Sequence, residues 1–168
     1  MRAQRYSASA IELGVELSVN TSETSQHEAP AVAIADNGAF TIAWQGRDGN
    51  GDGITARAYD SNGNALTVTD QVVNTTVNGL QDAPDVAMAS DGSSLVVWRN
   101  NTAKEIRGRR YDAAGIALGD EFVISTTHSV KPEAPCASLA GDGSSYIVMY
   151  EARDGNGSGV FALWVPLQ

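Results

Sequence analysis

The sequence predicts an all-β fold of tandem four-stranded antiparallel repeats, arranged like the blades of a β-propeller. One type of segment recurs three times, and each copy has a proline, an apolar alternation, a tight turn and a second apolar run. The prolines that open the copies are 54 and then 51 residues apart. No stretch of the chain has apolar side chains at helical spacing. The copies cover residues 30–46, 84–100 and 135–151.

Each full repeat contains four short strand candidates, which we name a to d in chain order. Val, Ile, Ala, Thr and aromatic residues are frequent in all four, and Gly, Asn and Asp separate them. An Asp-Asn-Gly or Asp-Gly sequence joins a to b, because Asn and Gly tolerate the positive φ angles of tight hairpins. Separate β-sandwich modules are disfavoured, since a unit of about 50 residues buries little surface by itself. In the first full repeat the strands are expected at residues 31–35, 39–45, 54–59 and 70–75.

The chain is predicted to be one repeat domain, 1–168, of about three blades. Single-chain propellers usually have at least about four blades. One interpretation is a fragment of a longer array. The other is a homodimer in which strands c and d of one chain complete strands a and b of the next, giving a ring of about six blades. A surplus c-like strand at the end competes for that place. The expected parts are strands c and d in 2–21, full blades in 30–76 and 84–127, and a partial blade in 135–165.

Composition and charge exclude several classes of function. The chain is 42% hydrophobic and 18% charged, which is typical of a globular domain. Eleven Lys and Arg face 20 Asp and Glu, a net charge of −9, so nucleic-acid binding is not expected. No run of about 18 apolar residues occurs, and no membrane insertion is predicted. The single cysteine, Cys136, excludes intrachain disulfides. Cations and neutral polar ligands such as sugars remain as ligands.

The repeat also has a recognisable pattern. Residues 81–87 read Q-x-x-P-x-V-A, residues 91–98 begin with Asp-Gly and end with Trp, and residues 110–112 read R-Y-D. This pattern resembles the roughly 50-residue repeats of large bacterial secreted and surface proteins, which often carry hemolysin-type (RTX) or cadherin-like segments. The resemblance implies an extracellular or cell-surface location and a role in adhesion or ligand display. The RTX nonapeptide itself is absent, so calcium binding of that kind is not carried over.

A calcium site is one interpretation of the loop between strands b and c of the first full repeat. Asp48, Asn50 and Asp52 alternate with glycines, as oxygen ligands do at the start of calcium loops. The closing ligand should come at position nine or twelve of such a loop, where this chain has Ala56 and Tyr59. The alternative is a polar hairpin without a bound ion.

An acid stands two residues before each repeat proline, in the segment that joins strand d to the next strand a. These acids are Glu28, Asp82 and Glu133. Strand a lies nearest the axis of a propeller, so the three carboxylates could form an acidic ring that binds a cation or a polar ligand. The alternative is structural, because an Asp or Glu can accept backbone N–H groups and stabilise the turn.

Aromatic residues supply the remaining ligand candidates. Trp44 and Trp98 end strand b in the two full repeats, and Met149 or Tyr150 holds that place in the last one. The two tryptophans could stack on a sugar ring or pack between blades. Trp164 departs from the repeat pattern and is expected at an edge or an interface.

These features favour a non-catalytic binding or scaffolding module of an exported protein. Its glycan or protein ligand would bind the face built from the b–c and d–a loops. The sequence lacks the HExxH, G-x-S-x-G, P-loop and Rossmann glycine motifs of common enzymes. Two alternatives stay open. One is a structural spacer stabilised by Ca²⁺, and the other is a hydrolase, because propeller faces can host active sites.

Overall fold

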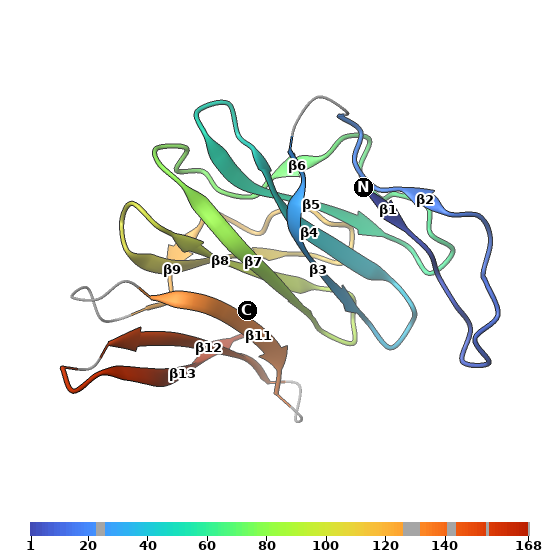
Figure 1. Ribbon diagram of the computed structural model, residues 1–168. Coiled ribbons are helices and arrows are strands. Elements are labelled where there is room, and N and C mark those ends of the chain that lie inside the picture. The colour runs from blue at the N-terminus through green and yellow to red at the C-terminus, as the bar shows by residue number, and fades with distance from the viewer. Residues whose placement is uncertain (23–25, 126–131, 141–143, 154, 168) are drawn as a thin grey trace.

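The computed structural model describes residues 1–22, 26–125, 132–140, 144–153 and 155–167. Within these ranges the chain forms strands and turns and no helix, so none that could span a membrane. The predicted all-β fold of antiparallel repeats is confirmed (Figure 1). The strands in these ranges are β1 (Arg2–Ala3), β2 (Leu17–Ser18), β3 (Glu28–Ile34), β4 (Phe40–Arg47), β5 (Asp52–Tyr59), β6 (Gln71–Val72), β7 (Gln81–Met88), β8 (Ser94–Asn100), β9 (Glu105–Tyr111), β10 (Phe122–Val123), β11 (Glu133–Leu139), β12 (Ser145–Arg153) and β13 (Ser158–Pro166).

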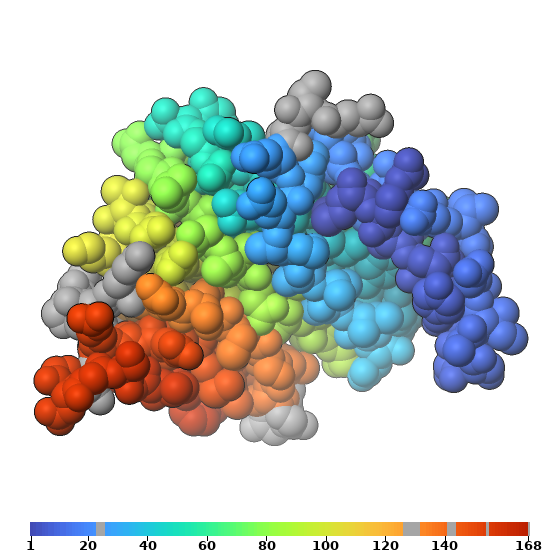
Figure 2. All heavy atoms as spheres, in the orientation of Figure 1, coloured from blue at the N-terminus to red at the C-terminus, as the bar shows by residue number. Residues whose placement is uncertain are grey.

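The strands form four sheets, which we call blades 0 to 3 in chain order. Blade 1 has the order β3-β4-β5-β6 and blade 2 the order β7-β8-β9-β10, so both contain strands a to d side by side. Blade 0 consists of β1 and β2, which correspond to strands c and d. Blade 3 has the order β11-β12-β13, which corresponds to a, b and c. Blade 0 and blade 3 lie at opposite ends of the molecule (Figure 2).

The a strands of blades 1 to 3 lie in a row, and we call them the inner strands: β3, β7 and β11. Strand β7 lies between β3 and β11 (Figure 1). The amide of Ala137 on β11 donates a hydrogen bond of 2.7 Å to the carboxylate of Asp85 on β7. Blades 1 to 3 therefore pack face to face, and their a strands all lie on the same side of the array. This is the arrangement of blades in a propeller.

Hydrophobic clusters between successive blades hold the array together. Alternate side chains of one strand point to opposite faces of its sheet. Val96 and Trp98 of β8 therefore pack toward blade 1, while Val97 of the same strand packs toward blade 3. Trp44 lies in the cluster between blades 0 and 1, and Tyr150 in the cluster between blades 2 and 3. The stability of each blade thus depends on its neighbours.

Blade 3 contains one more residue in its a–b hairpin than the other blades. The hydrogen bond that closes this hairpin spans residues 89–93 in blade 2 and residues 140–145 in blade 3. The extra residue shifts the alternation of β12 by one position, which exchanges the two faces of a strand. Tyr150 is therefore 2% exposed and holds the place of the tryptophans, whereas Met149 is 43% exposed. The structure decides between these two residues in favour of Tyr150.

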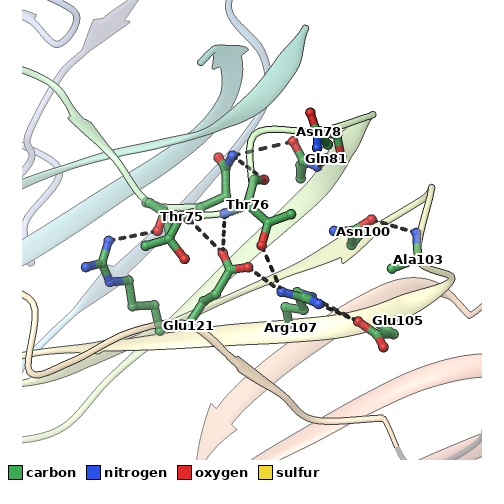
Figure 3. Close-up of polar contacts among 12 residues, drawn as sticks. Thr75, Thr76, Asn78, Gln81, Asn100, Ala103, Glu105, Arg107 and Glu121 are labelled. Carbon is green, nitrogen blue, oxygen red and sulfur yellow. Dashed lines mark hydrogen bonds and ion pairs between the residues drawn. The ribbon is translucent and has the colours of Figure 1, made fainter. Parts of the chain in front are cut away.

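The acid directly before the d strand of blade 1 and that of blade 2 bind the backbone of the preceding blade. Asp70 accepts hydrogen bonds of 2.9 and 3.0 Å from the amide of Thr21 in blade 0. Glu121 accepts one of 2.7 Å from the amide of Thr75 in blade 1, and it also pairs with Arg107 (Figure 3). Burial raises the pKa of Glu121. Hydrogen bonds from Thr76, from the Thr75 amide and from Arg107 outweigh burial and hold this pKa below its ordinary value.

Candidate functional site

The three predicted acids lie at the start of the inner strands. Glu28 and Glu133 are the first residues of β3 and β11, and Asp82 is the second residue of β7. Because these strands lie side by side, the acids occupy the same end of the blades (Figure 1). We call this end of blades 1 to 3 the acid end.

Each acid is followed by an alanine in a strained backbone conformation. The φ angles of Ala29, Ala83 and Ala134 are 46°, 50° and 47°. Left-handed conformations are uncommon for residues other than glycine and cost about 1–3 kcal/mol each. The register of the a–b ladder shifts at the same three places, which marks a β-bulge in each of blades 1 to 3. Bulges change the direction of a side chain relative to the ladder, and they are frequent next to functional sites.

Arg99 connects the acids of two neighbouring blades. Its Nε and Nη2 atoms donate hydrogen bonds of 2.6 and 2.7 Å to the two carboxylate oxygens of Asp82. Its Nη1 atom lies 3.6 Å from a carboxylate oxygen of Glu133. The hydrogen bonds to Asp82 raise the pKa of Arg99. About a fifth of the Arg99 and Asp82 side chains and half of the Glu133 side chain is exposed, so a ligand can reach Glu133.

The residue opposite each acid on strand b is also polar. It directly follows the repeated aromatic residue of strand b, which is Trp44, Trp98 or Tyr150. The acid end therefore contains carboxylates, an amide and a guanidinium, which together donate and accept hydrogen bonds. Sequence reasoning missed these partners, although their position after the repeated aromatic residue was visible. The cross-strand pairs are Glu28 with Gln45, Asp82 with Arg99, and Glu133 with Glu151.

The two repeated tryptophans are part of the core, which corrects their place among the candidate ligand-binding residues. Trp44 is 1% exposed and Trp98 is 0% exposed. Neither ring has a face on which a sugar could stack, because both pack between blades.

Trp164 is 66% exposed on β13, at the edge of blade 3 as expected. Its partner in the ladder is Ile147, whereas Glu151 pairs with Val160. Four residues of strand separate Ile147 from Glu151, which corresponds to about 13 Å. Trp164 therefore does not join the acids.

The b–c loop of blade 1 carries the predicted calcium ligands, and the side chains of all three contact other groups of the protein. Asp48 accepts hydrogen bonds from the amide of Asn50 and from the side chain of Asn74. Asn50 donates a side-chain hydrogen bond to Asn78, and Asp52 lies 3.5 Å from Arg47. Among the described residues, no group of three or more His, Cys, Asp or Glu is placed to hold a metal ion. Calcium binding stays a prediction, and the polar hairpin explains the loop without it.

Asn74, for which the sequence predicted no structural role, joins the loops at the acid end of blade 1. Its Oδ1 atom accepts a hydrogen bond of 2.8 Å from the amide of Ile54, and its Nδ2 atom donates one of 2.8 Å to Asp48. Only glycine fits at position 53, since a Cβ atom there would lie 2.5 Å from Asp48. Ser125 makes the corresponding contact in blade 2, to the amide of Ile106. This network supports the b–c loop next to the inner strands.

The sequence matches no family model and no curated protein. Several solved structures are nevertheless similar in fold. A protein of unknown function from Dyadobacter fermentans DSM 18053 has a TM-score of 0.60 and 14% identity over 89% of this chain and 41% of that chain. A Hadza microbial sialidase has a TM-score of 0.57 and 12% identity over 82% of this chain and 35% of that one. The α-L-arabinanase of Penicillium chrysogenum, complexed with arabinobiose, has a TM-score of 0.52 and 15% identity, covering 85% and 46% of the two chains.

These similarities concern the fold. The chain spans less than half the length of each of the three solved structures. At 12–15% identity, they show that the blades of this chain are arranged as in known proteins. The predicted β-propeller-like fold is thus confirmed. The resemblance to repeats of bacterial surface proteins stays a prediction.

Proposed function

We propose that the chain is a binding module that holds a polar ligand, in the first place a carbohydrate, at the acid end of its blades. The observation that carries this proposal is the position of Arg99 between Asp82 and Glu133, which come from neighbouring blades. Each acid stands on a strained bulge, and backbone strain of this kind is concentrated at functional sites. The resemblance noted above would place such a module in an exported protein.

A carbohydrate suits the chemistry of the acid end. Sugar hydroxyl groups both donate and accept hydrogen bonds, and this end offers carboxylates, the Gln45 amide and the Arg99 guanidinium. The net charge of −9 disfavours anionic ligands. Two of the structures similar in fold are described as a sialidase and as an arabinanase complexed with arabinobiose, which supports a sugar as the first ligand to test.

Binding is favoured over catalysis by the state of Asp82. Both of its carboxylate oxygens accept hydrogen bonds from Arg99. A general base or nucleophile needs an oxygen directed at the substrate. The Arg99 pair instead gives Asp82 a structural role, and it leaves Glu28 and Glu133 as the acids that contact the ligand.

A glycan array with the labelled chain tests this proposal, followed by calorimetry on the glycan that binds best. We expect Glu133→Gln to weaken that binding about tenfold or more, because a hydrogen bond to a charged group is lost. Glu12→Gln is the matched control, since it removes one charge from the exposed c–d turn at the other end of blade 0. A broad array without any bound glycan would contradict the proposal, and so would equal weakening by both variants.

Glycoside hydrolysis is the second candidate, and one observation favours it. Glu133 and Glu151 face each other across adjacent strands, and glycosidases use pairs of nearby carboxyl groups. Release of nitrophenol from a panel of aryl glycosides tests this function. Activity that Glu133→Gln and Glu151→Gln abolish, and that Glu12→Gln keeps, would replace the binding module with an enzyme.

A further inference from the structure

Two apolar side chains of the innermost strand of blade 1 are more exposed than their counterparts in the next blade. Val32 and Ile34 on β3 are 66% and 69% exposed. Val86 holds the position of Val32 on β7, and it is 4% exposed. A groove of about 660 Å³ lies beside Val32 and Ile34, with Arg2–Tyr6 on its other side. We call it the hairpin groove.

The internal interfaces show what covers such a surface in this fold. Val86 packs against Ala33 and Ala43, which come from strands a and b of blade 1. Ala137 packs in the same way against Ala87 and Val97, from strands a and b of blade 2. Each inner strand is thus covered by the a–b hairpin of the blade before it.

Blade 0 supplies the other two strands of such a blade. Its residues Ala3, Leu17 and Val19 pack against Phe40 and Trp44 of β4. In the same way, strands c and d of blade 1 and of blade 2 cover strand b of the blade that follows. The outer half of the surface of blade 1 is therefore covered, and its inner half forms the hairpin groove.

Strand β1 also presents a backbone edge to the groove. It pairs with β2 on one side. The corresponding strands β5 and β9 pair with a b strand on the other side, over eight and seven residue pairs. An exposed strand edge is a template for pairing with a further strand.

We propose that the hairpin groove binds a β-hairpin of this same repeat type, formed by strands a and b. Its b strand pairs with β1, and small apolar side chains from one face of the hairpin pack on Val32 and Ile34. Strand a of a repeat hairpin begins with an acid, so the bound hairpin adds a further acid beside Glu28. This proposal concerns a different surface from the sugar-binding proposal and stands independently of it.

Blade 3 of a second copy is a less suitable occupant. In a dimer, β1 of one chain would pair with β12 of the other. That edge of β12 is already paired with β13 of its own chain, over nine residue pairs. β1 of another chain can pair there only after β13 has left. The groove therefore fits a hairpin whose b strand has a free edge.

A chain extended at its N-terminus tests the proposal. The Val19 amide donates to the Met1 carbonyl as the Val73 amide does to that of Ile54, so Met1 holds the place of Ile54. Residues 28–53 fused directly before Met1 would thus supply strands a and b and their loop in register. We expect the melting temperature to rise by at least about 4 °C, and no rise with the same residues in shuffled order.

Val32→Glu provides the second arm. In the present chain, where Val32 is exposed, this variant should shift the melting temperature by less than about 2 °C. In the extended chain it should remove most of the gain. A synthetic peptide of residues 28–53 should raise the melting temperature of the unextended chain with increasing concentration. An extension that gives no gain, or a gain that Val32→Glu leaves intact, would overturn the proposal. A two-chain mass that Val32→Glu abolishes would show a second copy as the occupant instead.

Discussion

Arg99 and Asp82 are cross-strand partners in blade 2, and two parallel hydrogen bonds of 2.6 and 2.7 Å join the guanidinium to the carboxylate. Such bidentate pairs are among the stronger polar contacts in proteins and have a defined geometry. This pair holds the Arg99 guanidinium next to Glu133 of the following blade. The geometry of the proposed binding site therefore depends on it.

Asp82→Asn should lower the free energy of unfolding by about 1–3 kcal/mol, because the largely buried Arg99 loses the carboxylate that accepts its two short hydrogen bonds. Urea unfolding followed by circular dichroism measures this loss. The double variant Asp82→Asn with Arg99→Gln should be no less stable than Asp82→Asn alone, since it also removes the largely buried cation. If the loss of stability in the double variant equals the sum of the losses in Asp82→Asn and in Arg99→Gln, the two side chains have no interaction energy.

The contact of Glu121 with blade 1 should depend on pH. Its pKa is lower in the folded protein, because the ionised form accepts hydrogen bonds from Thr75, Thr76 and Arg107. The stability it contributes is therefore fully present above the ordinary glutamate pKa of about 4.3, and it is lost as the pH falls through the folded pKa.

The comparison of the native chain with Glu121→Gln measures this contribution. At pH 7 the variant should be less stable by about 1–3 kcal/mol, as the Glu121 side chain is 4% exposed. The difference between the two proteins should shrink when urea unfolding is repeated below pH 4. A difference that stays constant from pH 7 to pH 3 would contradict the assignment.

The strained alanines lead to a prediction in which a glycine stabilises the protein. Ala83 has a φ of 50°, a conformation in which its Cβ atom is crowded. Ala83→Gly should raise the free energy of unfolding by about 0.5–1 kcal/mol, and Ala83→Val should lower it by more than about 1 kcal/mol. Thermal melting of the two variants and of the native chain measures these changes in stability. Destabilisation by glycine would mean that the bulge is unstrained.

Trp164 should account for most of the tryptophan fluorescence that a quencher in solution can reach. It is 66% exposed, whereas Trp44 and Trp98 are buried. Trp164→Phe should therefore remove most of the quenching by acrylamide and leave the melting temperature nearly unchanged. Trp98→Ala should keep the quenching and destabilise the protein by about 3–5 kcal/mol. Strong quenching in Trp164→Phe would contradict the burial of the other two rings.

Much of the fold could be predicted, because the chain repeats. The prolines mark strand a, the Gly and Asn turns separate the strands, and the alternation of apolar residues distinguishes strands from helices. The face of β12 could not be predicted in the same way. One extra residue between Ala140 and Ser145 decides whether Tyr150 or Met149 is buried, and the alternation of apolar residues does not reveal it.

The acid end was predicted in part. The spacing from the repeat prolines identified Glu28, Asp82 and Glu133. Arg99 and Glu151 were missed, because a cross-strand partner depends on the ladder register, and the register shifts at each bulge. The contacts of Asn74 and Glu121 join elements 20 or more residues apart, and they become visible only once the blades are packed.

The central claim is that acids from neighbouring inner strands form one binding site. Calorimetric titration with the best glycan from the array measures this most directly, in the native chain and in the variants Glu28→Gln, Glu133→Gln and Glu12→Gln. We expect the dissociation constant to rise about tenfold or more for the first two variants and to stay unchanged for the third. The same dissociation constant in all four proteins would show that the ligand binds elsewhere.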